Sequence, residues 1–268
     1  MTKNIWVTGK KGQLASEIYN LNLNSLGNFH FTSFKDVDIS NKNMVEDYIE
    51  SKKINLIINC AAFTDVDGAE INEKEVYDVN AYGVKNILDS AFKHDCKLIQ
   101  ISTDYVFGNS NKKEINESHS TNPLNIYGKS KLMGEKFIIE SKVNSVIIRT
   151  SWLYSKFGKN FLKKIIELSM NKKKISVIDD QIGTPTYAKN LAMLCLKFVE
   201  TSDFNIIDRE IYNYSDGGSC SWFEFACEIK NQSGFKSQIE PISTLEFNQI
   251  AQRPNYSCLL YTSDAADE

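Results

Sequence analysis

The sequence lacks the cysteine and histidine patterns that mark zinc sites and disulfide frameworks. Its six cysteines are scattered along 268 residues, no two of them form a C-x-x-C pair, and only His30, His94 and His119 are present. A structural zinc ion needs four closely spaced nitrogen or sulfur ligands, and a small disulfide frame needs regularly spaced cysteines. We therefore expect no metal site, and we expect reduced, structural thiols.

Long apolar runs are also missing. No stretch approaches the roughly 20 residues that a helix needs to cross a bilayer. The first residues, MTKNIWVTGKKG, lead directly into a strand-like run and lack the charged-then-apolar layout of a secretory signal. We therefore expect a cytoplasmic protein that does not associate with membranes.

Positive charge is sparse and dispersed. The formal net charge is −3, and Lys172-Lys173-Lys174 is the only compact basic cluster. A solvated helix end or turn explains this cluster better than a phosphate or RNA site, and an acidic chain has no general attraction for nucleic acid. We expect no nucleic-acid partner.

Apolar runs rich in β-formers alternate with helical patterns through the first 150 residues. Strands are predicted at 4–9, 28–34, 54–62, 97–103 and 144–152, with a helix from about Gly12 and helical segments at 44–52 and 72–95. Continuous apolar strands that alternate with helices indicate a parallel sheet covered on both faces. The predicted fold class is α/β, a doubly wound parallel sheet of the Rossmann-like type.

The pattern loosens after Trp152. Helices are predicted at 160–170, 188–200 and 221–234 and strands at 175–180 and 210–216, and no internal repeat or low-complexity linker occurs. We predict that 1–155 and 183–216 form the Rossmann-like part. Residues 156–182 and 217–257 would form a small lobe interleaved with it.

A glycine-containing loop separates the first strand from the first helix. Gly9 and Gly12 allow a tight turn and a close approach to a pyrophosphate, and Ala15 can serve where helix and strand pack closely. The ribose-binding carboxylate expected about 20 residues later is absent. Lys35 stands near that position and favours NADPH over NADH, unless it simply points into water.

Hydroxyl and amine groups collect at the expected carboxyl edge of the sheet. Ser102, Thr103 and Asp104 end the fourth strand, and Tyr127 and Lys131 lie one helical turn apart. A tyrosine has a reference pKa near 10, so it needs a nearby cation to act at neutral pH, and Lys131 is placed to supply one. The alternative is a packed ring beside a solvated amine, which the glycine loop and the strand-end hydroxyls make less attractive.

Several longer stretches carry a resemblance to a known family. NCAAFTDVDGAE, STDYVF, NPLNIYGKSKLMGE, RTSW and DQIGTPT occur in order between residues 59 and 186. With them the chain resembles the extended short-chain dehydrogenases/reductases, and within these the reductases of dTDP-4-keto-6-deoxy sugars. The resemblance implies hydride transfer from NADPH or NADH to the C4 carbonyl of a dTDP-sugar, in the synthesis of rhamnose for cell-surface polysaccharide.

The resemblance also implies that the Rossmann-like part binds NAD(P), that the lobe binds the substrate, and that each matching residue has a role. Catalysis would involve Thr103, Tyr127 as proton donor and Lys131, while Thr103, Asp104 and Trp152 would contact the sugar; Trp222 is read as a buried structural indole. The cofactor would be held by Gly9, Gly12, Gln13, Leu14, Asp38, Ile39, Ala61, Ala62, Phe63, Thr64, Ile101, Ser102, Tyr127 and Lys131.

Two alternatives stay open at this point. The chain could reduce a different dTDP-4-keto-6-deoxy sugar, because few lobe residues set the specificity. It could also resemble the regulatory subunit of methionine adenosyltransferase, which uses the same fold without catalysis. Some family members form dimers bridged by magnesium through glutamates; Lys189 and Asn190 occupy one such region here, so we predict no metal and leave a homodimer open.

The final residues depart from the family pattern. The family's R-P-x-x-S-x-L motif begins at Arg253, but CLLYTSDAADE then follows and resembles a translated adaptor used in preparing sequencing libraries. We predict that 258–268 are not native and that the substrate lobe is truncated. A genuine short acidic tail is the alternative.

Overall fold

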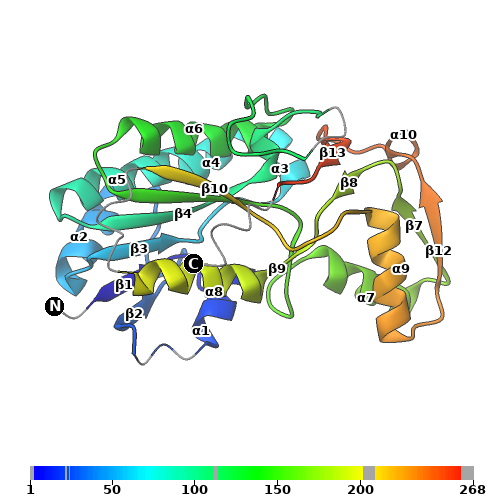
Figure 1. The fold of residues 1–268 in the computed structure, drawn as a ribbon, viewed down its shortest axis with the longest axis horizontal. Coiled ribbons are helices and arrows are strands. Elements are labelled where there is room, and N and C mark those ends of the chain that lie inside the picture. The colour runs from blue at the N-terminus through cyan, green and yellow to red at the C-terminus, as the bar shows by residue number, and fades with distance from the viewer. Residues whose placement is uncertain (1–2, 22, 24, 111–113, 202–208, 261–268) are drawn as a thin grey trace.

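The protein is built around a twisted parallel sheet. A computed structural model describes residues 3–21, 23, 25–110, 114–201 and 209–260. Within these ranges six strands form the main sheet in the spatial order β2-β1-β3-β4-β5-β10 (Figure 1). They are β1 (Asn4–Val7), β2 (Asn28–Phe31), β3 (Leu56–Asn59), β4 (Lys97–Thr103), β5 (Ser145–Thr150) and β10 (Glu210–Tyr214).

Alternate side chains of these strands fill two separate cores. Ile5 and Val7 of β1 belong to one core, under α1 (Gln13–Tyr19) and α8 (Ala188–Glu200). Trp6 belongs to the other core, under α2 (Lys42–Lys52), α5 (Gly83–Lys93) and α6 (Ile126–Glu140). Each fully buried large aliphatic side chain stabilises such a core by about 1.5–3 kcal/mol. Helices on both faces of a parallel sheet confirm the predicted doubly wound fold.

The strand order places the functional edge. The chain runs from β1 outward to β2 and then crosses back to β3 on the other side of β1. Helices on either side of this reversal lie on opposite faces, so a crevice opens beyond the carboxyl ends of β1 and β3. Ligands of open α/β sheets bind in such a crevice.

A smaller lobe with its own core lies beside the sheet, at the right of Figure 1. It consists of α7 (Phe161–Asn171), β7 (Lys174–Ile178), α9 (Trp222–Ser233) and β12 (Gln238–Ile242). β7 and β12 pair in parallel, and Ile165, Ile175 and Ile229 are buried between them and the helices. The lobe draws on two separated stretches of the chain, and the bounds predicted for it stay a prediction.

Short strands connect the lobe to the sheet. β8 (Ile182–Gly183) pairs with β11 (Cys220–Ser221) on one side and with β13 (Tyr256–Ser257) on the other. β6 (Leu153–Tyr154) pairs with β9 (Thr186–Tyr187). These pairings bring residues from 153 to 257 to the carboxyl edge of the main sheet.

The structure differs from the predicted elements in one helical region and in several short elements. The segment 72–95 is divided into α4 (Glu73–Tyr77), a π-helical turn η1 (Asp78–Tyr82) and α5, because Asn80 turns inward to bond with the loop after β3. Sequence patterns also missed α3 (Val66–Ile71), the 3₁₀ turn η2 (Asp104–Val106), β12 and α10 (Thr244–Phe247). None of the helices within the described ranges has the length and apolar character that crossing a bilayer requires.

The first residues of the predicted non-native tail pack into the fold. The amide of Ile115 donates to the carbonyl oxygen of Cys258 at 2.9 Å, and Leu259 is buried beside Phe107. Residues 261–268 lie outside the described residues. The non-native origin of the tail stays a prediction.

Candidate active site

The loop after β1 forms a cradle lined by backbone. Gly9 has φ +71°, and a Cβ at this position would lie 2.9 Å from the carbonyl oxygen of Cys60. A Cβ at Gly12 would lie 3.1 Å from the carbonyl oxygen of Gly9, and Gly12 caps α1 without a side-chain hydrogen bond. Side chains at either glycine would collide with neighbouring backbone, so glycine is what allows this tight loop. A loop of this kind before a helix can accept a dinucleotide pyrophosphate, and that role stays a prediction here.

Gln13 and Leu14 follow the cradle with different surroundings. The Gln13 amide donates to the carbonyl oxygen of Leu153 at 3.1 Å and accepts from Asn160 at 2.9 Å. Leu14 is buried in the core under α1, so it could meet a cofactor only through its backbone. Gln13 thereby links the cradle to the segment that precedes α7.

A shallow cavity of about 460 Å³ lies at the outer end of the crevice. Phe34, Asp38, Ile71 and Val79 are among its lining residues. The side chain of Asp38 is held by the backbone and hydroxyl of Ser40 at 2.9 and 2.7 Å. Asp38 and Ile39 are among the residues that the resemblance assigns to the cofactor, and Ile39 is buried.

The segment after β3 (Ala61, Ala62, Phe63 and Thr64) is fixed by a buried amide. Asn80 accepts from the Phe63 amide at 2.8 Å and donates to the Phe63 carbonyl oxygen at 3.1 Å. Its Nδ2 also donates to Ser130 Oγ at 3.0 Å, next to Lys131. Sequence reasoning missed Asn80, although an asparagine inside an otherwise helical, half-apolar stretch was an available signal.

Helix α6 brings Tyr127 and Lys131 to the end of β4. Asn125 caps the helix by accepting from the Gly128 amide at 2.8 Å. A Cβ on Gly128 would lie 2.2 Å from the carbonyl oxygen of Tyr105, so only glycine lets the helix approach this closely. The close approach sets Tyr127 against the strand-end residues.

Lys131 is buried and is held by the backbone. Its Nζ donates to the carbonyl oxygen of Ile101 at 2.7 Å. Burial lowers the pKa of Lys131 to about 8, against the opposing effects of Glu135 and Cys60. Glu135 itself accepts from Ser102 Oγ at 2.5 Å and from Arg149 at 2.7 and 3.0 Å. The Ser102 hydroxyl is thus engaged with a buried ion pair.

The hydroxyl that meets Tyr127 belongs to Thr103. Burial raises the pKa of Tyr127 to about 12, while a hydrogen bond with Thr103 acts in the lowering direction. Sequence reasoning assigned the tuning of this tyrosine to Lys131; here the local contact comes from Thr103, and the lysine amine is bound to Ile101.

Asp104 is almost fully enclosed. It is 3% exposed, its Oδ1 accepts from Thr103 Oγ1 at 2.9 Å, and its Oδ2 accepts from Ser257 Oγ. Burial raises the pKa of Asp104 to about 6 against the lowering effect of these bonds. The predicted contact of Asp104 with the sugar stays a prediction.

Trp152 lies between the sheet and the lobe in a left-handed backbone conformation, with φ +44°. Its ring stacks on Trp222 of α9, with centroids 3.4 Å apart and planes 6° from parallel. A Cβ on Gly183 would lie 2.3 Å from the Trp152 ring, so the glycine of DQIGTPT makes room for the indole. Trp222 is half-buried and also packs against the lobe core, so it is less enclosed than expected, and its role as a structural indole stays a prediction.

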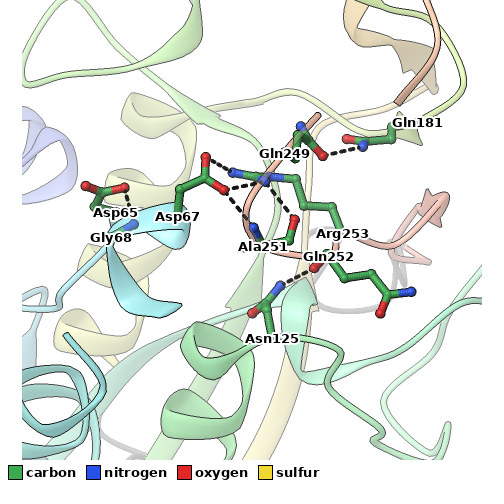
Figure 2. Close-up of polar contacts among 9 residues, drawn as sticks. All are labelled: Asp65, Asp67, Gly68, Asn125, Gln181, Gln249, Ala251, Gln252 and Arg253. Atoms are coloured by element: carbon green, nitrogen blue, oxygen red, sulfur yellow. Dashed lines mark hydrogen bonds and ion pairs between the residues drawn. The ribbon is translucent and has the colours of Figure 1, made fainter. Parts of the chain in front are cut away.

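Residues 249–259, here called the 249–259 segment, are anchored on several elements, and Figure 2 shows the polar contacts of the first part of the segment. Arg253 forms a two-point ion pair with Asp67, with both distances 2.9 Å. Asp67 also accepts from the Ala251 amide at 3.0 Å. The capping residue Asn125 donates to the Gln252 carbonyl oxygen at 2.8 Å, which joins the segment to the start of α6.

The structure brings the predicted residues together in two linked groups. Gly9, Gly12 and Ala61 meet at the cradle, and Thr103, Tyr127 and Lys131 meet at the end of β4. Trp152 connects to the second group through Gly183, which pairs with Ser257 beside Asp104. Among the described residues, no cluster of three or more histidine, cysteine or acidic side chains is placed to hold a metal ion.

Comparisons with known proteins agree with this geometry. The chain is 34% identical to the dTDP-4-dehydrorhamnose reductase of Aggregatibacter actinomycetemcomitans, over 94% of this chain and 89% of the relative. It is also 34% identical to the spore coat polysaccharide biosynthesis protein SpsK of Bacillus subtilis, over 97% and 89%. A crystal structure of the dTDP-4-dehydrorhamnose reductase of Bacillus anthracis in complex with NADP superimposes with a TM-score of 0.92 at 38% identity, covering 98% of this chain and 92% of that one.

A family model matches nearly the whole chain. The model is described as the RmlD substrate binding domain, and it spans residues 3–267. The match includes the glycine loop, the Tyr-Lys helix and the 249–259 segment. The chain therefore belongs to the RmlD substrate-binding-domain family.

Proposed function

We propose that this protein reduces the C4 keto group of dTDP-4-dehydro-6-deoxy-L-mannose to give dTDP-L-rhamnose. The observation that carries the proposal is the meeting of Thr103, Tyr127 and Lys131 at the carboxyl edge of a sheet whose glycine cradle fits a dinucleotide. Family membership and relatives named for this reaction support it. The name of the Bacillus subtilis relative supports a place in cell-surface polysaccharide synthesis, and we expect a cytoplasmic enzyme.

NADPH is the proposed cofactor. Gly9, Gly12 and Gln13 would hold the pyrophosphate, Asp38 and Ile39 the adenosine, and Ala61–Thr64, Ile101 and Ser102 the nicotinamide side. Lys35 is exposed, shortly after β2. The hydrogen bonds from Ser33 lower the pKa of Asp36 most, and the positive charges of Lys10 and Lys11 nearby lower it further. These amines favour a 2′-phosphate, as does the NADP bound to the Bacillus anthracis relative. When bound, NADPH supplies the hydride for the carbonyl carbon.

Tyr127 would deliver the proton to the sugar oxygen. Its raised pKa keeps the phenol protonated at neutral pH, so a proton is available when negative charge develops at C4-O. Thr103 can donate to the phenolate that remains. Lys131 is charged below about pH 8. It would bind the nicotinamide ribose and stabilise the negative charge of the phenolate.

The lobe would provide the sugar-nucleotide site. We assign substrate binding to 156–182 and 217–257, whose separate core leaves the Trp152–Trp222 pair at the junction with the sheet. Trp152 would contact the deoxysugar from this junction. Specificity among dTDP-4-keto sugars would depend on the shape of this aromatic wall.

NADPH oxidation in the presence of dTDP-4-dehydrorhamnose tests the proposal, with NADH and other keto-sugar nucleotides as comparisons. Tyr127→Phe should lower kcat by about 10²-fold or more, the usual contribution of a positioned proton donor. Tyr48→Phe is a matched control, because Tyr48 packs on Trp6 in the core under α2. Near-normal turnover in Tyr127→Phe would contradict the assigned role. Binding of the nucleotide without any turnover in the parent protein would favour the regulatory-subunit alternative.

A further inference from the structure

A chain of buried hydroxyl and carboxylate groups extends from the 249–259 segment to the proposed proton donor. Ser257 Oγ donates to Asp104 Oδ2, and Thr103 Oγ1 donates to Asp104 Oδ1 at 2.9 Å. The Tyr127 ring packs against Tyr105, with centroids 5.9 Å apart, and the Tyr105 amide donates to the same Thr103 Oγ1 at 3.2 Å, which brings Tyr127 beside Thr103. Ser257, Asp104 and Thr103 are 3%, 3% and 5% exposed. Water therefore has little access, and the partners of each group are set by the fold.

The hydroxyl of Thr103 has one proton and two competing acceptors. In the structure this proton points to Asp104, while the amide of Tyr105 donates to Thr103 Oγ1 at 3.2 Å. If Tyr127 gives up its proton, the phenolate becomes a second strong acceptor for the same Thr103 proton. Whether Thr103 can turn depends on how well Asp104 is satisfied by its other donor, Ser257.

Ser257 is held in place by backbone pairing rather than by chance contact. It pairs with Gly183 in β8, and the amide of Ile182 donates to the Asn255 carbonyl oxygen at 2.9 Å. The ion pair between Arg253 and Asp67 anchors the same segment a few residues earlier (Figure 2). A hydroxyl fixed on both sides can set the direction of the carboxylate that it binds.

We propose that Ser257 is a positioning residue for proton donation, which holds the Asp104 carboxylate and leaves the Thr103 hydroxyl able to turn toward Tyr127. The inference rests on the proposed reduction and assigns a function to a residue 130 positions away from Tyr127 in sequence. Ser257 acts on the reaction only through Asp104 and Thr103. No bond to the sugar or to the cofactor is required of it.

The first test separates kcat from KM. Ser257→Ala should lower kcat about tenfold, the rate change that follows from losing one hydrogen bond of average strength, and should leave KM for the sugar nucleotide within about twofold. Ser257→Thr keeps a hydroxyl and should recover most of the rate. Ser145→Ala is the matched control. Ser145 is also fully buried and donates to the Val143 carbonyl oxygen at 2.9 Å, but it lies at the start of β5, at the edge of the sheet away from the candidate site.

The second test needs no turnover. The protein is labelled with 3-fluorotyrosine, and the fluorine resonance that is missing from Tyr127→Phe identifies Tyr127 among the 12 tyrosines. Ser257→Ala should shift this resonance, and Ser145→Ala should not. Asp104→Asn should shift it too, and adding Ser257→Ala to Asp104→Asn should have no further effect, because both changes interrupt one path.

The outcomes distinguish this inference from the proposed function. An unchanged kcat and an unmoved Tyr127 resonance in folded Ser257→Ala would overturn the role of Ser257 while leaving the reductase intact. A parent protein that fails to reduce the sugar would overturn the proposed function, and the fluorine measurement would still decide whether Ser257 positions Tyr127. If Ser257→Ala does not fold, an unmoved Tyr127 resonance in Asp104→Asn overturns the inference.

Discussion

At the scale of single residues, Lys131 combines a positive charge with almost complete burial. The residue is 4% exposed, and its Nζ donates to the Ile101 carbonyl oxygen, while the charges of Glu135 and Cys60 favour the protonated amine. Burial has the larger effect and lowers the pKa to about 8. The charge that supports the reaction is therefore lost within an accessible pH range.

This pKa gives a prediction for the pH profile. Lys131 is charged below about pH 8 and becomes neutral as the pH rises through that value, so kcat/KM, which reports groups of the free enzyme, should fall on the alkaline side. Steady-state NADPH oxidation between pH 6 and 10 measures it. Lys131→Met should lose this alkaline step together with most of the activity. A flat profile up to pH 9.5 in the parent would contradict the assignment.

Gly183 gives a second prediction at this scale. Gly183→Ala would place a methyl group 2.3 Å from the Trp152 ring, so the indole must shift, which disturbs its stacking on Trp222. We expect a loss of about 1–3 kcal/mol in the free energy of unfolding, typical of overpacking, and a changed tryptophan fluorescence. Gly217→Ala is the control, because nothing lies within 4 Å of a Cβ there. Equal stability and fluorescence in the two variants would show that the ring does not depend on Gly183.

At the scale of elements, the 249–259 segment determines how the lobe, α3 and α6 meet. It pairs with β8, binds Asp67 near the start of α3 and receives a hydrogen bond from Asn125 at the start of α6. Burial alone would raise the pKa of Asp67, but its bonds with Arg253 and Ala251 lower it overall. The ion pair is thus formed at neutral pH and joins elements that lie 186 residues apart.

Breaking this ion pair should loosen the segment. Arg253→Met keeps most of the side-chain volume and removes both bonds to Asp67, so we expect the free energy of unfolding to fall by about 1–2 kcal/mol. Urea unfolding followed by circular dichroism measures the change. Lys74→Met, which removes an exposed ion pair with Asp78, should leave the unfolding midpoint nearly unchanged. Equal midpoints for both variants would argue against an anchoring role.

Sequence periodicity predicted the long elements well and the short ones poorly. The bounds of α8 at 188–200 and β4 at 97–103 match the prediction, because apolar spacing over many residues leaves little ambiguity. Short elements such as α3, α10 and β12 contain too few residues to show a hydrophobic period. The π turn at Asn80 depends on a hydrogen bond to Phe63, 17 residues away, which no local pattern contains.

At the scale of the whole molecule, the candidate site could be predicted where its residues sit in local motifs. The glycine loop, Thr103 and the Tyr127–Lys131 pair were found from sequence, and the structure places Thr103 against Tyr127. Ser257 and Trp222 were not assigned to the site, since they reach it only through β13 and α9. What joins them is the pairing of distant strands across β8.

The proposed reaction transfers a hydride from NADPH to C4 of the sugar and a proton to the oxygen on C4. The most direct measurement uses NADPH carrying deuterium at the transferred position with dTDP-4-dehydrorhamnose, followed by NMR of the isolated product. We expect dTDP-L-rhamnose with deuterium at C4, formed about 10²-fold or more slowly by Tyr127→Phe. Deuterium at another carbon, or no deuterium in the product, would contradict it.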